Sequence, residues 1–153
     1  MELGKTIDEI EIGESASFAK TISESDVYLF AGITGDFNLV HINEEYARQT
    51  LFRGRVVHGA LTTSFMFPVL GTKLPGLGTI AVEVTTRYKA PVRFGDTVTA
   101  TAEVIAKDVS ANRLRMKLTW SNQDGAEVAE GEALVMPPTR KLKERFAALG
   151  RGG

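Results

Sequence analysis

Residues 59–70 read GALTTSFMFPVL, and this stretch decides the fold. It contains no charged residue, and only Thr62, Thr63 and Ser64 interrupt its apolar residues. A helix at a protein surface keeps one polar face, whereas a helix that is apolar on most sides has to be surrounded by protein. The stretch therefore predicts a central helix, with Pro68 near its end, around which the rest of the chain is wrapped.

The wrapping element is predicted to be a sheet, because residues 79–136 alternate with the period of β-strands. Val82, Val84 and Tyr88 alternate with polar residues. Two further runs repeat the pattern: Val98, Ala100, Ala102, Val104, and then Leu114, Met116, Leu118, Trp120. Turn residues at 95–96 and 123–125 separate consecutive strands, which indicates an antiparallel sheet.

Small residues on the last strand suit a helix packed against the sheet. Ala129, Gly131 and Ala133 share one face of the strand near 127–136, and we expect them to let the helix approach closely. One buried helix and a curved antiparallel sheet make an α+β fold.

Shorter helices are predicted on both sides of this core. Residues 23–26, SESD, form a capping box, and the segment 43–45, NEE, starts a second short helix. We expect one domain over residues 1–138. The tail 139–153 is basic and weakly amphipathic, with Leu142, Phe146 and Leu149 on its apolar side.

Composition excludes several classes of protein. The chain has 153 residues and a net charge of −1, which does not suit nucleic-acid binding. It contains no cysteine, which excludes disulfides, thiol nucleophiles and cysteine-rich metal sites. The acidic N-terminal residues do not form a signal peptide, and no apolar run is long enough for a membrane span. We therefore expect a cytoplasmic protein.

Acid–base chemistry remains, and Asp36 and His41 are its first candidates. On a regular helix, residues five apart point about 140° away from each other, so these two meet only on irregular backbone. Gly35 and Asn38 favour such backbone. A carboxylate and an imidazole that converge on one water form a general acid–base pair near neutral pH. The spacing alone also suits a turn-forming aspartate and a capping or core histidine.

A second candidate is the pair His58–Gly59, which opens the central helix. The first N–H groups of a helix lack internal partners and lie at its positive end. Glycine allows close approach to the backbone, so the N–H of Gly59 is placed to bind a carbonyl oxygen that develops negative charge. Close packing at the helix start is the structural alternative for this glycine.

These motifs resemble, in order, those of the MaoC-like dehydratases, specifically the (R)-specific enoyl-CoA hydratases. The family pattern G-D-x-N-P-(aliphatic)-H is similar to GDFNLVH at 35–41, with Leu39 in place of the proline. V-H-G follows at 57–59, a counterpart of L-G-x-x-L-P-G at 70–76, and P-V-x-x-G-D-x-V at 91–98. The resemblance covers about 70 residues.

The resemblance implies a hot-dog fold, a homodimer or dimer-based oligomer, and an acyl-CoA substrate. It implies reversible syn addition of water to a trans-2-enoyl thioester, without metal or redox cofactor. By motif, Asp36 and His41 are the catalytic pair and Gly59 is the oxyanion donor. Asn38, His58 and Lys89 are the expected substrate-binding or supporting residues. Lys89 also fits an ordinary solvated strand face.

Two other functions are compatible with the fold. A hot-dog thioesterase typically carries an acid on or beside its central helix, and residues 59–70 have none. A non-catalytic acyl-CoA-binding subunit is the second, although both Asp36 and His41 are present. The sequence does not distinguish coenzyme A from an acyl carrier protein as the thiol carrier.

Overall fold

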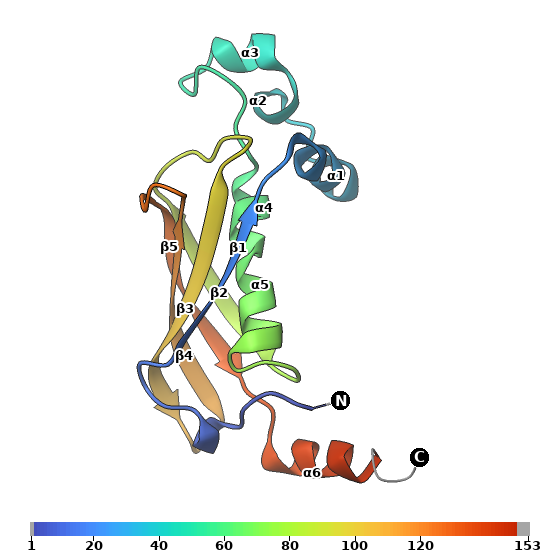
Figure 1. The fold of residues 1–153 in the computed structure, drawn as a ribbon, viewed down its shortest axis with the longest axis vertical. Helices are drawn as coiled ribbons and strands as arrows, with labels where there is room; N and C mark the ends of the chain where they lie inside the picture. The colour runs from blue at the N-terminus through green and yellow to red at the C-terminus, as the bar shows by residue number, and fades with distance from the viewer. Residues whose placement is uncertain (1, 150–153) are drawn as a thin grey trace.

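A five-stranded antiparallel sheet lies along one side of a central helical segment in the computed structural model, which describes residues 2–149 (Figure 1). The order across the sheet is β1-β3-β4-β5-β2. The strands are β1 (Ser15–Thr21), β2 (Ile80–Tyr88), β3 (Thr97–Asp108), β4 (Arg113–Ser121) and β5 (Glu127–Met136). The predicted α+β architecture with a central helix is confirmed.

The central segment consists of three consecutive helical pieces. They are α4 (Gly59–Ser64), α5 (Met66–Pro68) and the π-helical turn η2 (Val69–Lys73). The helix therefore runs a few residues past the predicted end. Proline has no N–H for an α-helical bond, and the chain continues beyond Pro68 in the wider π-helical turn.

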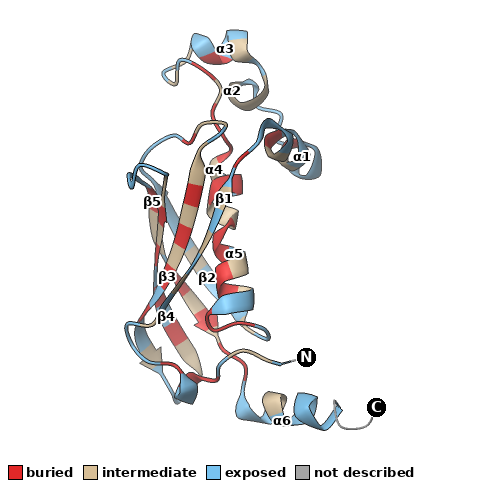
Figure 2. Cartoon of the chain, viewed as in Figure 1, coloured by how far each residue is buried: buried red, intermediate tan, exposed pale blue. Residues whose placement is uncertain are grey.

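Protein covers the central segment on one side only. Leu61, Met66 and Val69 are buried in the main core, whereas Phe67 is 52% exposed. The predicted burial of the central helix against the sheet is confirmed, although part of its surface is left exposed in the described chain. The sheet covers one face of the helix, and the opposite face stays open in a single copy (Figure 2).

Strands β3 and β4 show the predicted alternation. Their inward residues are completely buried: Val98, Ala100, Ala102, Val104, Leu114, Met116, Leu118 and Trp120. Strand β2 differs, because Val82 is 49% exposed and only Val84 of its predicted inward residues packs against the core. β2 is an edge strand, and a bulge between Ala81 and Glu83 breaks its alternation.

The predicted turn at Gly95–Asp96 joins strands that do not pair. It leads from β2 to β3, but β2 pairs with β5, on the far side of β4. Of the two predicted turns, only the one at 123–125 lies in a hairpin, between β4 and β5. A second hairpin joins β3 and β4 through residues 109–112. The antiparallel prediction holds, although adjacency along the chain was not a reliable sign of pairing here.

Gly131 is small for a reason other than the predicted one. A Cβ built on Gly131 would lie 1.9 Å from the carbonyl oxygen of Thr85 in the neighbouring strand β2. The backbone of β2, rather than the central helix, therefore excludes a side chain at this position.

The remaining helices begin with the predicted capping residues. In α1 (Glu24–Thr34), the Ser23 hydroxyl and the Asp26 carboxylate cap each other's backbone N–H groups. The short helix α2 (Leu39–Ile42) follows. In α3 (Glu44–Arg48), the Asn43 side chain accepts a hydrogen bond from the N–H of Tyr46.

The two ends of the described chain lie together, away from α1–α3 (Figure 1). α6 (Arg140–Leu149) is joined to the single turn η1 (Ile7–Glu9) by ion pairs from Lys143 to Glu9 and from Arg140 to Asp8. The last residues of the predicted tail, 150–153, lie outside the described residues. Across residues 2–149, no helix has the length and apolar character needed to cross a membrane.

We predict that Gly131→Ala destabilises the fold. The added Cβ would displace the backbone of β2, and overpacking of this kind costs up to about 3 kcal/mol. The free energy of unfolding, measured by urea denaturation, tests this. Gly32→Ala is the matched control, because Gly32 lies in α1 with open space around it and alanine gains up to about 1 kcal/mol in a helix. Equal stability of Gly131→Ala and the parent chain would contradict the conclusion that the backbone of β2 excludes a side chain at residue 131.

Candidate active site

Irregular backbone between α1 and α2 carries Asp36 toward His41. α1 ends at Gly35, which adopts a left-handed conformation with φ of 78°. The Asp36 carboxylate accepts a hydrogen bond from the N–H of Asn38 at 3.2 Å. The Asn38 side chain in turn caps α2, and α2 presents His41. This is the break in regular structure that the spacing of Asp36 and His41 requires.

Three side chains converge at this point: Asp36, His41 and His58. One nitrogen or oxygen atom from each lies within 4.8 Å of the others. Asp36 is exposed, His41 is partly buried and His58 is buried. The structure therefore brings together the two predicted catalytic residues and the histidine that precedes the central helix.

A main-chain carbonyl orients the His41 ring. Nδ1 of His41 lies 2.8 Å from the carbonyl oxygen of Val56, so Nδ1 donates and Nε2 is left as the basic nitrogen. Burial lowers the pKa of His41 below its usual 6.5, and the neighbouring His58 adds to this lowering. The Val56 carbonyl and Asp36 act in the opposite direction on the same pKa. The ring is thus favoured in its neutral, base-competent form at neutral pH.

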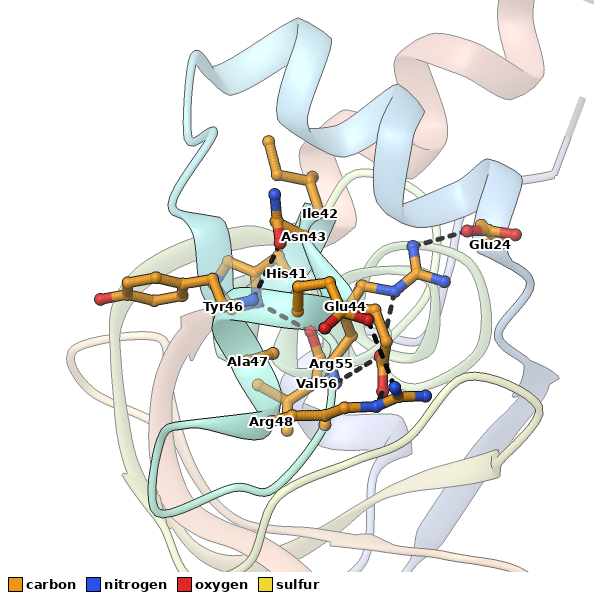
Figure 3. A network of polar contacts seen from close by, with 12 residues as sticks. Glu24, His41, Ile42, Asn43, Glu44, Tyr46, Ala47, Arg48, Arg55 and Val56 are labelled. Atoms are coloured by element: carbon orange, nitrogen blue, oxygen red, sulfur yellow. Dashed lines mark hydrogen bonds and ion pairs between the residues drawn. The ribbon is translucent and has the colours of Figure 1, made fainter.

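A polar network that sequence analysis did not identify holds the carbonyl of Val56 in place (Figure 3). The N–H of Val56 donates to the carbonyl of Val40, one residue before His41. The adjacent Arg55 donates a hydrogen bond from side-chain Nη1 to the Glu24 carboxylate at 2.6 Å. The main-chain N–H of Arg55 donates to the Glu44 carboxylate at 3.2 Å. Arg55 therefore joins α1 and α3 to the irregular segment 55–58 beside the site. Isolated Arg and Glu residues give no sequence signal for such a link.

A cavity of about 570 Å³ opens beside this cluster. Its wall includes His41, Asn38, Gly59, Tyr88 and Lys89. Asp36 and His58 lie outside the residues that line it. The cavity is large enough for a small acyl thioester to reach His41 and the start of the central helix.

Gly59 is the first residue of α4 and is closely packed. A Cβ built on it would lie 2.7 Å from Cε1 of Tyr88. The structural alternative for this glycine, close packing, therefore applies. It does not exclude the role in binding, since Gly59 also lines the cavity at a helix start, where N–H groups lack helical partners.

The two remaining candidates differ in their surroundings. Lys89 lines the cavity, but its ammonium group lies 2.6 Å from the carboxylate of Glu127 and 3.1 Å from that of Glu130. The hydrogen bond to Glu127 is the main reason that the pKa of Lys89 is raised. His58 is 1% exposed, and its Nε2 lies 2.9 Å from the carbonyl oxygen of Asp36. Its ring therefore contacts the loop that carries Asp36 rather than the cavity.

Asp36, His41 and His58 are also the one group of described residues with the types and spacing of metal ligands. The two imidazole rings are stacked, with centroids 3.9 Å apart and planes 29° from parallel. Ring nitrogens bind metals in the plane of the ring, and nearly parallel planes do not suit convergence on one ion. The two rings are therefore poorly placed to bind one ion together.

Leu39 occupies the first position of α2, directly after the capping Asn38. Proline is favoured at this position of a helix, because its missing N–H has no helical acceptor there. Leu39 is 43% exposed, and α2 forms with leucine in this place. The departure from the family pattern leaves the loop that carries Asp36 and His41 intact.

Comparisons with known proteins find relatives that match most of the chain. The protein-family model of the MaoC-like domain matches residues 9–124 of this sequence. An (R)-specific enoyl-CoA hydratase of Rhodospirillum rubrum is 50% identical over 133 residues, which are 87% of this chain and 92% of the relative. A 3-hydroxybutyryl-CoA dehydratase of Methylorubrum extorquens is 39% identical, covering 95% and 92%. The solved structure of an R-hydratase from Pseudomonas aeruginosa superposes with a TM-score of 0.84 at 37% identity, covering 91% and 89%.

We predict that Leu39→Pro stabilises the chain by about 0.4–1 kcal/mol. Asn38 has φ of −55° and ψ of 127°, which is the extended conformation that a residue before proline adopts, so the substitution mainly restricts the unfolded chain. Thermal unfolding measures the effect. Val40→Pro is the matched control and should destabilise, because it removes the N–H that Asn38 caps. A lower midpoint for Leu39→Pro would show that the first turn of α2 needs another conformation.

Proposed function

The chain belongs to the family of MaoC-like domains, and we propose that it is an (R)-specific enoyl-CoA hydratase, a hydro-lyase that adds water reversibly to trans-2-enoyl-CoA thioesters. The observation that carries the proposal is the convergence of Asp36 and His41 beside a cavity that Gly59 also lines. The (R)-specific hydratases among its relatives supply the substrate class.

Polarisation of the thioester is assigned to the start of the central helix. The substrate carbonyl oxygen accepts a hydrogen bond from the N–H of Gly59, where the helix dipole also favours negative charge. As the β-carbon is attacked, charge develops on this oxygen. One such donor contributes about 3 kcal/mol of transition-state stabilisation in comparable sites.

Asp36 and His41 act on a single water molecule. Nε2 of His41 and the Asp36 carboxylate hold the water, and one of them takes a proton as the oxygen attacks the β-carbon. The same pair returns a proton to the α-carbon on the same face, which makes the addition syn. The product is the (R)-3-hydroxyacyl thioester when the substrate presents to the pair the face of the double bond whose attack at the β-carbon gives that configuration. Asn38 supports the loop through its cap on α2. The steps move only protons and water, so they require no redox cofactor or metal.

The alternative functions are less well supported. A thioesterase acid is missing from the central segment, since residues 59–73 contain neither Asp nor Glu. A non-catalytic binding subunit would not need an oriented imidazole, yet the His41 ring is fixed by Val56. Relatives at 26% and 30% identity are dehydratases of acyl-carrier-protein thioesters, so the carrier of the acyl group stays a question for direct assay.

The coenzyme A part of the substrate is expected near the rim of the cavity. Lys89 is the predicted cation there, and its two carboxylate partners would have to be exchanged for a phosphate. We therefore expect Lys89 to contribute only modestly to the binding of coenzyme A. A cytoplasmic location, inferred from the sequence, stays a prediction.

We also propose that two copies associate through the edge strand β2. The outer side of this nine-residue strand has no partner strand in the described chain. Its apolar residues Ile80, Val82 and Tyr88 are each about half exposed, and a long apolar edge is prone to pair with another copy. Because Tyr88 lines the cavity, a second copy at this edge would lie next to the site.

Hydration of crotonyl-CoA tests the function. We expect the purified protein to remove the ultraviolet absorbance of the conjugated thioester, and Asp36→Asn to lower kcat by about 10²–10⁴-fold, because a positioned acid or base is lost. Asp8→Asn, beside α6 at the opposite end of the molecule, should leave the rate unchanged.

Two results would contradict this assignment. Near-normal turnover by Asp36→Asn would remove Asp36 from the mechanism. Release of free thiol without loss of the double bond would instead identify a thioesterase.

Light scattering after size-exclusion chromatography tests the association. We expect a mass of at least twice the 16.6 kDa of one chain. Val82→Lys should shift the protein toward the single-chain mass, because a lysine on the strand would meet the partner strand. Val109→Lys, at an equally exposed residue after β3, is the control that should not. A single-chain mass for the parent protein would exclude the proposed dimer.

A further inference from the structure

His58 lies behind the wall of the cavity rather than in it. Its neighbours Val57 and Gly59 both line the cavity, but its own side chain is 1% exposed and does not. His58 also precedes α4 as its N-cap residue without making a side-chain capping bond. Neither substrate contact nor helix capping therefore explains why a polar ring is buried here.

The contacts of His58 lead to the two catalytic residues instead. A carbonyl oxygen only accepts, so Nε2 of His58 donates to the carbonyl of Asp36 at 2.9 Å. On the ring face, His58 is stacked on His41, with centroids 3.9 Å apart. Phe30 of α1 packs against the His58 ring as well, at 5.0 Å. His58 thus contacts the backbone of one catalytic residue and the ring plane of the other.

The remaining nitrogen fixes the tautomer. Nδ1 of His58 is buried and has no hydrogen-bond partner among the described residues. A hydrogen on Nδ1 would be a buried donor without an acceptor, which is costly, so the hydrogen belongs on Nε2, toward Asp36.

The two histidines form a reciprocal connection between two chain segments. His41, at one end of the segment 36–41, donates to the carbonyl of Val56, and His58 donates back to the carbonyl of Asp36. The N–H of Val56 completes the connection through the carbonyl of Val40. Rotation of either segment would break at least one of these bonds.

We propose that His58 is a positioning residue, which holds the backbone of Asp36 and the ring plane of His41 so that both meet the same water. The proposal rests on the proposed hydratase function. It replaces the substrate-binding role that the V-H-G motif suggested for His58, since a buried ring outside the cavity wall cannot contact the acyl group.

Two substitutions separate the two contacts of His58. His58→Phe keeps an aromatic ring for stacking but removes the donor to Asp36. His58→Gln keeps an N–H donor at the position of Nε2 but removes the ring. We expect His58→Phe to lower kcat for crotonyl-CoA by about 10- to 100-fold, because a misplacement of about 1 Å has effects of this size, and His58→Gln to recover part of the loss. KM should stay within about threefold in both.

The pH profile provides a readout that a merely structural histidine would not change. Among the described residues, His58 and Asp36 are the titratable groups that act on His41. Burial is the largest cause that lowers the pKa of His41, and the His58 ring covers one face of the His41 ring. His58→Gln uncovers that face, so the pKa of His41 rises and its base form is lost at a higher pH. The acidic limb of kcat should therefore move to higher pH in His58→Gln and stay near its parent position in His58→Phe, which keeps a covering ring. Val27→Ala, at a buried core residue of α1, is the control for lost stability and should not move the limb.

Several outcomes would overturn the proposal. Folded variants that keep kcat within about twofold and the parent pH profile would do so. Nitrogen NMR of the histidine-labelled parent protein, which needs no variant to fold, gives an independent result. Hydrogen on Nε2 of His58 supports the bond to Asp36, and hydrogen on Nδ1 refutes it. If the parent protein does not hydrate crotonyl-CoA, the hydratase function fails, while the NMR result still decides the geometry of His58.

Discussion

Burial of the uncharged helical segment is the constraint on which the rest of the structure depends. Residues 59–72 contain no charge, so one face of the segment has to be covered by the sheet, and Leu61, Met66 and Val69 are buried there. Fixing this helix against the sheet also fixes its first residue. Gly59 therefore occupies a defined place in the cavity wall, and the proposed oxyanion donor needs no separate element to position it.

The proposed catalytic residues come from outside this core and are held through main-chain carbonyls. Asp36 lies on the loop after α1, and His41 lies in the four-residue helix α2, which is too short to fix the ring by itself. His41 is oriented by Val56, and the backbone of Asp36 by His58. Val56 and His58, which lie just before the central helix, thus hold the proposed acid–base pair in a fixed position relative to that helix. Arg55 strengthens the same link through its bonds to Glu24 and Glu44 (Figure 3).

The exposed face of the central helix, like the position of Gly59 at its start, follows from the way this helix packs on a single sheet. One sheet cannot cover a helix that is apolar on most of its sides, and Phe67 is left half exposed. The edge strand β2 is likewise exposed on both faces. Both features lie on parts of the chain that a second copy would be expected to cover, and Tyr88 joins that edge to the cavity wall. Association and catalysis are therefore coupled in the proposed function.

The sequence by itself determined the features that depend on local pattern. The uncharged run predicted the central helix, alternation predicted β3 and β4, and capping residues predicted the starts of α1 and α3. Gly35 and Asn38 predicted the irregular backbone that lets Asp36 meet His41. These properties follow from residues a few positions apart, where side-chain period and backbone preference act directly.

Only the tertiary structure decided which distant segments meet. It paired β2 with β5 rather than with β3, and it showed that Gly131 makes room for the backbone of β2. It brought the His58 ring into contact with the Asp36 carbonyl and the His41 ring. It also placed the Lys89 ammonium group between two carboxylates. Such contacts join residues far apart in the chain through main-chain carbonyls and common charged residues. Every residue has a main-chain carbonyl, and most protein surfaces carry charged side chains. The sequence therefore does not show which carbonyl or which charged residue a given side chain will contact.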